Sequence, residues 1–343
     1  MKRIEYLLIK IVIIFLLFTG CSDDPLQVDV SDMQLNLKLI RMDETVFDAS
    51  WDSPQITNIE LSEKYKGYYQ FYTQFILNNQ MDVDDPNMGK YVAGFANDKT
   101  MKEFFMAAED LFKEDKFDPY LYEMQTAFKH FKYYYPNEPV PMILTFQSGF
   151  NYKIVPNDTL LGIGLEWYIG NSSDLIKRLS PQAFPVYEKE KMQPEYLVVD
   201  AVKGFLKVKY QEKMVMENLL SVMIFYGKIM YLTDAMLHKK SDALKMNYTD
   251  EEWIWCMDNE KEIWIFLAEN NLLFDSSMLV ISKWVNNGPF TNGLSQDSPA
   301  RVGIWMGWRM VKQYMENNPK VSIQKMMEME DNSLFLNNYK PGK

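Results

Sequence analysis

Residues 214–232 form the segment that most restricts the fold of this 343-residue chain. Almost every side chain in the segment is apolar, and the polar residues Glu217, Ser221 and Lys228 are separated by four and then seven positions. At helical periodicity this spacing places all three on one narrow stripe and leaves the rest of the helix apolar. A helix that is apolar nearly all round needs neighbours on every side. We therefore expect it to run through the centre of a domain.

Helical patterns also dominate the rest of the chain. Apolar residues at helical spacing predict helices over 59–77, 101–112, 119–133, 196–210, 250–270, 277–286, 298–317 and 321–328. Extended stretches predict strands over 33–43, 142–146 and 160–169. The pattern indicates an α+β fold, mainly helical, with a small mixed β-sheet and a long helical C-terminal half. One domain is expected over 33–343, with 33–135 and 136–343 as candidate sub-lobes.

The N-terminus carries an export signal. A positively charged start is followed by an apolar run over 11–18 and then by Thr19-Gly20-Cys21. These residues resemble a bacterial lipobox, in which the cysteine is acylated, for example with palmitate, and becomes the first mature residue. The alternative, a membrane-spanning anchor, needs roughly 20 apolar residues, more than this run contains. The sequence predicts a signal peptide over 1–20, with lipidated Cys21 and a tether over 21–32.

Residues 22–24, Ser-Asp-Asp, leave the final location open. They resemble the tag that exports some Bacteroidota lipoproteins to the cell surface, but such runs are also ordinary solvated linkers. We therefore expect a membrane-anchored lipoprotein of the cell envelope, on the periplasmic face or on the outer-membrane surface.

Charge and cysteine content exclude several classes of protein. The chain has a net charge of −11, which argues against binding nucleic acid and against an electrostatic grip on anionic lipid. Membrane attachment is therefore assigned to the acyl chains. Cys256 is the only cysteine besides Cys21, so no disulfide is expected within the chain.

Glu260 is the candidate catalytic side chain. In the helix predicted over 250–270 it falls on the apolar face that Met257 and Trp264 define. A carboxylate placed there needs a partner, because burying an unpaired charge is costly. The candidate partners are Lys228, Arg301 and Arg309. Glu260 is then either a catalytic acid or metal ligand, or one half of a structural ion pair.

The two histidines offer little support for a metal site or a catalytic triad. His130 and His238 lie in different predicted segments, so they cannot form the paired histidines of one zinc-binding helix. Neither is near a nucleophile-elbow pattern. We expect no metal and no cofactor.

Two groups of tyrosines are candidate binding surfaces. Tyr and Trp side chains are favoured at interfaces because they bury much area with few rotatable bonds. The candidate residues, for a glycan or for a partner protein, are Tyr65, Tyr68, Tyr69, Tyr133, Tyr134 and Tyr135. Core packing is the alternative explanation for these rings.

Several motifs together resemble the gliding-motility lipoprotein GldB family of Bacteroidota. They lie at residues 41–43, 149–152, 162–170, 226–231, 255–264, 288–291, 298–307 and 339–341. The resemblance covers nearly all of the mature chain. It implies an envelope lipoprotein connected with gliding motility and type IX secretion, with other envelope proteins as partners, and it implies no known reaction.

The order of elements is also similar to gluzincin-type metallopeptidases. In those enzymes a central helix carries the His-Glu-x-x-His zinc motif. The equivalent stretch here, residues 226–230, contains no His and no Glu. The resemblance therefore implies a zincin-like core without its metal, a pseudoenzyme. The leading hypothesis is a non-enzymatic lipoprotein that acts through protein–protein contacts. The alternatives are a carbohydrate- or peptidoglycan-binding lipoprotein and a divergent zincin-like peptidase.

Overall fold

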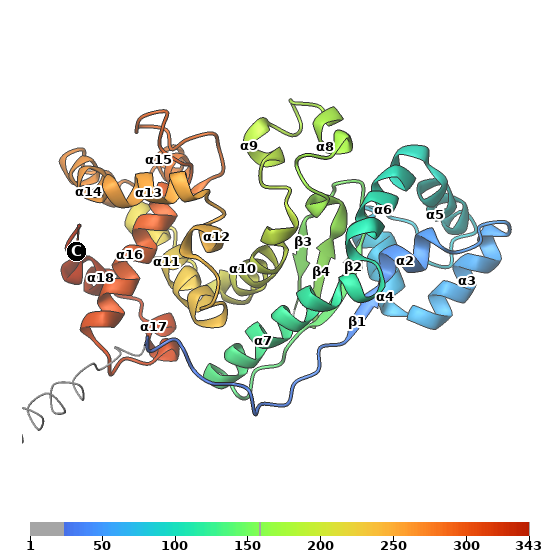
Figure 1. The fold of residues 1–343 in the computed structure, drawn as a ribbon, viewed down its shortest axis with the longest axis horizontal. Coiled ribbons are helices and arrows are strands. Elements are labelled where there is room, and N and C mark those ends of the chain that lie inside the picture. The colour runs from blue at the N-terminus through green and yellow to red at the C-terminus, as the bar shows by residue number, and fades with distance from the viewer. Residues whose placement is uncertain (1–23, 158, 343) are drawn as a thin grey trace, which may run out of the picture.

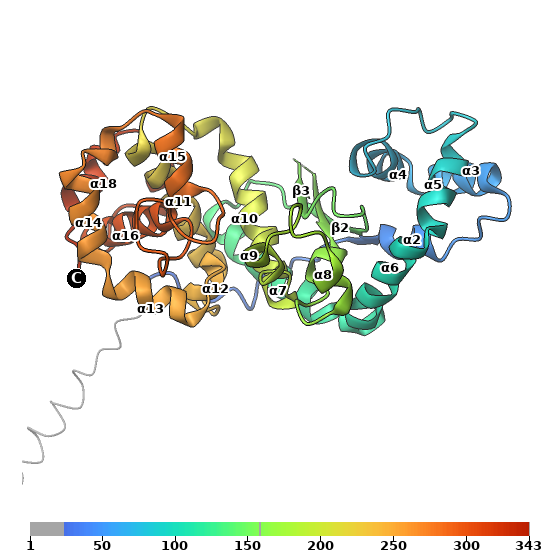
Figure 2. The same ribbon diagram turned by 90° about the horizontal axis from the view of Figure 1, so that it is seen from above.

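The computed structural model describes residues 24–157 and 159–342. Cys21 and the predicted signal peptide lie outside this range. The described chain is an α+β protein in which a small sheet stands between two groups of helices (Figure 1). Figure 2 shows the same order from above, with the C-terminal helices at one end and helices α3 to α6 at the other.

A four-stranded mixed sheet occupies the middle of the molecule. Its strands are β1 (Leu39–Arg41), β2 (Met142–Phe146), β3 (Ile154–Pro156) and β4 (Leu160–Gly164). They lie in the order β1-β2-β4-β3, with β2 parallel to β1 and β4, and β3 antiparallel to β4. Leu39 pairs with Ile143, and Met142 pairs with Leu160.

The N-terminal part of the chain forms helices beside the β1 end of this sheet, and the last of them, α7, runs below the sheet in Figure 1. They are α2 (Met42–Phe47), α3 (Pro54–Tyr65), α4 (Gly67–Gln70), the π-helical turn η1 (Phe71–Ile76), α5 (Met88–Asn97), α6 (Lys99–Phe112), η2 (Glu114–Lys116) and α7 (Asp118–Tyr134). A separate apolar core, which includes Val46, Tyr72 and Leu144, joins α2 and α5 to the sheet.

Beyond the sheet the chain is helical. The elements are η3 (Leu165–Tyr168), α8 (Asp174–Arg178), α9 (Val186–Lys189), η4 (Pro194–Tyr196), α10 (Leu197–Tyr210), η5 (Gln211–Lys213), α11 (Leu219–Met236), α12 (Asp242–Met246), α13 (Asp250–Asp258), α14 (Glu260–Glu269), η6 (Leu272–Phe274), α15 (Met278–Val285), α16 (Val302–Asn317), α17 (Ile323–Glu328) and α18 (Ser333–Asn338). The α+β class with a long helical C-terminal half is confirmed.

Helix α11 is the predicted central helix. All of its residues except Tyr226 are buried, and it packs most extensively against α16. By length and composition it is the one helix among the described residues that could cross a membrane, but 94% of it is buried inside the protein. It is therefore a core helix. It begins at Leu219 because Asn218 and Ser221 form a capping box, so Glu217 precedes the helix and is exposed.

The helix predicted over 250–270 is two helices. Asn259 separates α13 from α14, and its Nδ2 donates a 2.8 Å hydrogen bond to the carbonyl oxygen of Trp255. Asparagine side chains compete with the backbone in this way and interrupt helices. Glu260 is consequently the first residue of a helix and does not lie in the middle of one.

Three further boundaries differ from the sequence prediction. The strand expected over 33–43 is limited to Leu39–Arg41, because helix α2 starts at once at Met42. The strand expected over 160–169 ends at Gly164, where η3 begins. The helix expected over 59–77 is three pieces, since Lys66 has a positive φ of 50° between α3 and α4. Strand β3 and helices α5, α8, α9, α12 and α18 were not predicted.

The segment after the predicted lipid site packs on the body of the protein. Asp24 and Pro25 are exposed, but Leu26 and Val30 are buried, and Leu26 belongs to the main apolar core. The chain then runs beneath α7 to reach β1 (Figure 1). The expected tether over 21–32 therefore includes residues that belong to the folded domain.

Candidate functional site

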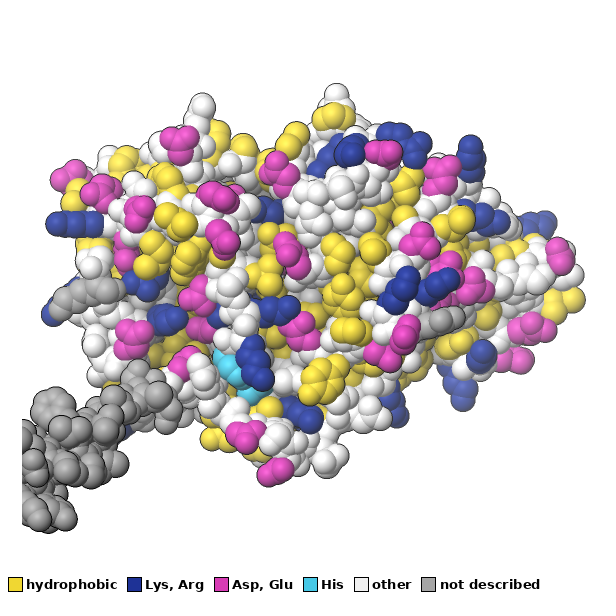
Figure 3. Space-filling view, in the orientation of Figure 1, with side chains coloured by type: hydrophobic (Ala, Val, Ile, Leu, Met, Phe, Trp, Pro, Cys, Tyr) yellow, Lys and Arg dark blue, Asp and Glu magenta, His cyan; other side chains and the backbone are white. Residues whose placement is uncertain are grey.

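A pocket of about 630 Å³ lies over helix α10, between the sheet side and the C-terminal helices. We call it the main pocket. One wall carries Lys153, Trp167 and the α9 residues from Val186 onward, and the other carries Asn247, Tyr248 and the loop over 287–289. Figure 1 shows α9 and α13 on either side, with α10 below them. Acidic and basic side chains are interspersed over the face seen in Figure 3.

Asp200 is the acid at the base of this pocket. Lys153 Nζ lies 2.6 Å from its Oδ2, and the Tyr168 hydroxyl donates to the same oxygen at 3.2 Å. Asn247 Nδ2 donates to Oδ1 at 2.8 Å. Burial raises the pKa of the Asp200 carboxyl, but Lys153 and Lys203 lower it by more, so its pKa is below the usual value. Asp200 is therefore an ionised and fully partnered group.

Lys203 lies one turn further along α10. Its Nζ donates to the backbone oxygen of Lys245 at 2.9 Å and also to Asn247 Oδ1. Asp200 Oδ1 is 4.0 Å away. Burial lowers the pKa of the Lys203 amine to about 7, against the opposing effect of Asp200. This amine exchanges its proton near neutral pH.

Arg301 is held in place by an unusual backbone conformation. Its φ of 62° lies in the left-handed region, where it caps the start of α16. Nη2 donates a 2.7 Å hydrogen bond to the oxygen of Met246, and the guanidinium lies 5.6 Å from the Tyr248 ring centroid. Its Nε is buried and has no hydrogen-bond acceptor among the described residues. The guanidinium is therefore positioned by backbone oxygens and an aromatic ring.

A second cavity of about 290 Å³, the adjoining pocket, shares Lys203, Asn287 and Arg301 with the main pocket. Its other lining residues include Lys207, the apolar side chains of α11 and α15, and Ile304. Tyr226 and Met230 of α11 line it, at the positions where the gluzincin resemblance places the zinc motif. The two pockets are therefore neighbours with a shared wall, and we refer to them together as the connected site.

Glu260 lies elsewhere and contacts one of its three candidate partners. Arg309 Nε lies 3.0 Å from Glu260 Oε1 and Arg309 Nη2 lies 3.3 Å from Oε2. The Tyr339 hydroxyl donates to Oε1 at 2.6 Å, and the pKa of Tyr339 is raised by burial and by this carboxylate. Glu260 is buried, and it lines neither pocket of the connected site.

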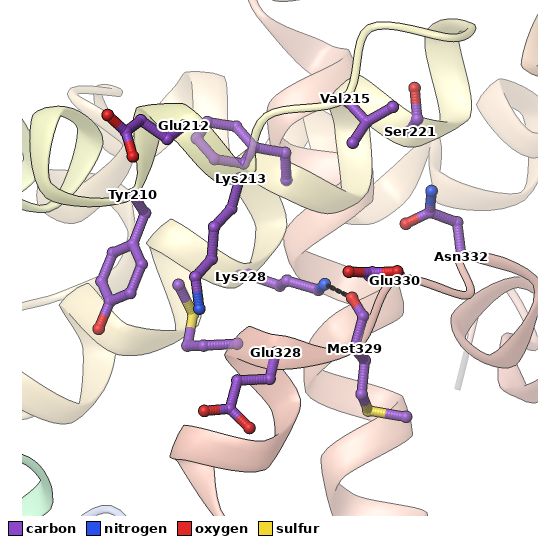
Figure 4. A pocket seen from close by; sticks show the side chains of 12 residues that line it. Tyr210, Glu212, Lys213, Val215, Ser221, Lys228, Glu328, Met329, Glu330 and Asn332 are labelled. Carbon is purple, nitrogen blue, oxygen red and sulfur yellow. Dashed lines mark hydrogen bonds between the residues drawn. The ribbon is translucent and has the colours of Figure 1, made fainter.

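Lys228 lies in a different cavity, of about 440 Å³, between η5, α11 and the end of α17 (Figure 4). Its Nζ donates to the backbone oxygen of Met329, and its pKa is lowered to about 8 by burial and by Lys213. Figure 4 shows Glu328 and Glu330 near Met329, whose backbone oxygen accepts the hydrogen bond from Lys228. Lys228 is thus not a partner of Glu260.

The candidate tyrosines do not form one surface. Tyr65, Tyr68 and Tyr69 are on α3 and α4, whereas Tyr133 to Tyr135 are at the end of α7. Tyr69 is fully buried, with its hydroxyl donating to Asn58 Oδ1 at 2.9 Å. Only Tyr68 and Tyr133 are exposed, at 36% and 52%. Most of these rings take part in packing, and no row of exposed rings is formed by the six.

The two histidines, which come from different elements, are in contact. Their ring centroids are 4.7 Å apart in an edge-to-face arrangement. Burial and the neighbouring His238 lower the pKa of His130 to about 4. No group of three or more His, Cys, Asp or Glu suited to a metal ion occurs in the part of the chain that the structure describes.

Sequence reasoning missed Lys153, Asp200, Lys203 and Asn247. For two of these residues the sequence did contain a signal. Asp200 and Lys203 are three positions apart on a helix that otherwise presents Val198, Val199 and Val202. A charged pair at this spacing on an apolar helix indicates a shared polar site. Lys153 and Asn247 could not be found this way, since they lie in loops far apart in the sequence.

Comparison with protein families and known proteins identifies the family of the chain. Neither the curated proteins nor the solved structures contain a significant relative, and the zincin-like core therefore stays a prediction. The family model described as gliding motility protein GldB matches residues 23–341, nearly the whole of the chain outside the predicted signal peptide. The match covers both pockets and the Glu260–Arg309 pair. This chain belongs to the family of the gliding motility protein GldB.

Proposed function

We propose that this protein is a non-enzymatic, lipid-anchored lipoprotein of the cell envelope that binds another envelope protein in the main pocket. Family membership supports a gliding-motility-associated lipoprotein. A connection with type IX secretion and a Bacteroidota host are part of the proposal, as the family resemblance implies.

The protonation state of Asp200 supports the non-enzymatic part of the proposal. A general acid or base works best when its pKa lies near the working pH. Asp200 has a lowered pKa, and both of its oxygens are taken by Lys153, Tyr168 and Asn247. It has little capacity to accept or deliver a proton at neutral pH. Lys203, whose pKa is about 7, already donates to the backbone oxygen of Lys245 and to Asn247 Oδ1. With its own partners, Asp200 forms a rigid polar floor for a binding site.

Composition of the rim supports a protein as the ligand. Trp167, Tyr187 and Pro289 line the main pocket beside charged residues of both signs. Mixed aromatic and charged surfaces are typical of protein interfaces. A glycan site would instead present stacked exposed rings, and the predicted tyrosines do not provide such a row.

The position of Leu26 supports close attachment to the membrane. It is buried in the core and lies five positions after Cys21. A fully extended chain of that length spans at most about 18 Å. A lipid on Cys21 would hold the end of the molecule where the segment after it joins the body within that distance of the bilayer surface.

A photo-crosslinking residue at position 186 tests the binding site in living cells. Val186 lines the main pocket and is 67% exposed, so substitution there leaves the core intact. Tyr122 on α7 is 70% exposed and lines neither pocket, which makes it the matched control position. We expect one envelope protein to be captured from position 186 and not from position 122.

Two results would count against the proposal. One is the same set of adducts from both positions. The other is stoichiometric zinc together with peptidase activity that Glu260→Gln abolishes, which would establish the peptidase alternative.

The lipid anchor has its own test. Cys21→Ser should shift the protein from the membrane fraction to the soluble fraction, and persistence in the membrane fraction would exclude acyl anchoring.

A further inference from the structure

The adjoining pocket is a cationic cavity in an acidic protein. The chain has a net charge of −11, yet no Asp or Glu lines this cavity. Three basic side chains do: Lys203, Lys207 and Arg301, of which Lys203, with a pKa of about 7, is only partly protonated at neutral pH. A local surplus of positive charge against the overall balance indicates a site for an anion.

Carboxylates neutralise these three basic side chains only incompletely. Among the described residues, neither Lys207 nor Arg301 has a carboxylate within salt-bridge distance. Lys207 Nζ lies 5.7 Å from the Tyr226 ring centroid, and the Arg301 hydrogen bonds end on the backbone oxygens of Met246 and Asn247. Lys203 Nζ donates to the Lys245 backbone oxygen and to Asn247 Oδ1, and its one carboxylate neighbour, Asp200 at 4.0 Å, lies closer to Lys153 at 2.6 Å. Positive charge is therefore available to a ligand.

The rest of the cavity wall is apolar. Tyr226, Ile229 and Met230 come from α11, Val285 from α15 and Ile304 from α16. A volume of about 290 Å³ is roughly ten times the 30 Å³ that a water molecule occupies in the liquid. The cavity therefore has room for a side chain beside the anionic group. Inorganic phosphate would fill only the cationic part and leave the apolar wall uncovered.

We propose, on the basis of the proposed function, that the adjoining pocket binds a carboxylate of the partner polypeptide together with a neighbouring apolar side chain. Lys203, Lys207 and Arg301 bind the carboxylate, and Tyr226 and Met230 contact the apolar group. The partner chain reaches this point through the main pocket, with which the cavity shares Lys203, Asn287 and Arg301. The carboxylate is either the chain terminus or an Asp or Glu side chain.

Peptide titration of the full mature lipoprotein in detergent tests this inference. The probe is acetyl-Ala-Ala-Leu with a free C-terminus, and binding is followed by NMR of ¹³C-methyl methionine, since Met230 and Met246 line the cavity. We expect these two signals to shift, and we expect the amidated peptide to bind at least tenfold more weakly. Acetyl-Ala-Glu-Leu-amide restores binding if a side-chain carboxylate suffices, and fails to do so if the chain terminus is required.

A matched pair of variants provides the control. Lys207 is exposed, so Lys207→Ala leaves the fold intact, and we expect it to weaken binding of the free-acid peptide at least threefold. Lys209 is two positions further on α10 and pairs with Glu138 at 2.6 Å, outside the cavity. Lys209→Ala should leave peptide binding unchanged.

Three outcomes would overturn the inference: equal binding of the amidated peptide, equal effects of the two lysine variants, and full competition by inorganic phosphate at the concentration of the peptide. Failure of the proposed function is recognised separately. A partner captured from position 186, in the absence of any carboxylate dependence, would leave the proposed function standing and remove only this inference.

Discussion

Gly227 of α11 and Gly307 of α16 lie in direct backbone contact at the centre of the molecule. A Cβ atom placed on Gly227 would be 2.3 Å from the carbonyl oxygen of Gly307. A Cβ on Gly307 would be 1.9 Å from the carbonyl oxygen of Met223. Only hydrogen at both positions lets the two longest helices of the C-terminal half approach so closely.

Replacing Gly307 by alanine should therefore destabilise the protein strongly. The added methyl group meets backbone, which cannot rotate away, so the loss should reach the upper end of the roughly 1–3 kcal/mol typical of overpacking, or exceed it. Urea denaturation measures the change in the free energy of unfolding. Gly94→Ala is the control, because Gly94 lies in α5 with no atom within 4 Å of its added Cβ. That substitution should stabilise the helix by up to about 1 kcal/mol. Equal effects of the two changes would refute the close-contact explanation.

Breaking the buried pair at Glu260 should cost more than losing one hydrogen bond. Arg309→Met leaves the carboxylate buried without its cation, for which we expect a loss of about 3–5 kcal/mol. Tyr339→Phe removes one bond to the carboxylate, for which about 1.5–3 kcal/mol is expected. The double variant Glu260→Gln/Arg309→Met should be more stable than Arg309→Met alone. Chemical denaturation of the native protein, these three variants and Glu260→Gln tests this order. If the losses of Glu260→Gln and Arg309→Met add up to that of the double variant, the two residues are not coupled.

Lys203 should make stability rise with pH in the alkaline range. Its pKa is about 7 in the folded protein and 10.5 in the reference state, so between these values the unfolded chain binds the extra proton. Stability then increases with pH, by up to about 1.4 kcal/mol per pH unit, relative to Lys203→Met. The difference between the two proteins, measured from pH 6 to pH 9, removes the contribution of Lys228, which both retain. A constant difference over this range would contradict the lowered pKa.

His130 should have a comparable effect at acidic pH. Its pKa falls from 6.5 to about 4 on folding, so the unfolded chain takes up the proton first as the pH drops. Stability is lost between pH 6.5 and 4, by up to about 1.4 kcal/mol per pH unit. His130→Gln should lose less stability than the native protein over that range. Parallel curves for the two proteins, followed by circular dichroism, would show that His130 does not contribute.

Local pattern was sufficient for much of the fold. The apolar stretch over 214–232 predicted a buried central helix, which the structure has at Leu219–Met236. The strands over 142–146 and from residue 160 onward were recognisable from their extended apolar sequence. Boundaries were less predictable where a single residue decides them, such as Asn259 between α13 and α14 or Lys66 after α3.

Glu260 shows how far such reasoning extends to a site. A carboxylate on an apolar face requires a cation, and three candidates follow from the sequence. Choosing Arg309 among them needs the crossing of α14 and α16, which brings together residues 49 positions apart. The histidines show another limit. Their separation in sequence excluded a pair on one helix, but it gave no sign that packing places their rings 4.7 Å apart.

The sequence by itself determined the helical class and the family, because both are encoded in contiguous residues as periodic apolar patterns and short motifs; the lipobox predicts the location in the same way. Tertiary structure alone assembled the candidate site. Lys153, Asp200, Asn247 and Arg301 come from four separate parts of the chain, and only the folded protein brings them to one pocket. Electrostatic partners are chosen by distance in space, which residue spacing does not record.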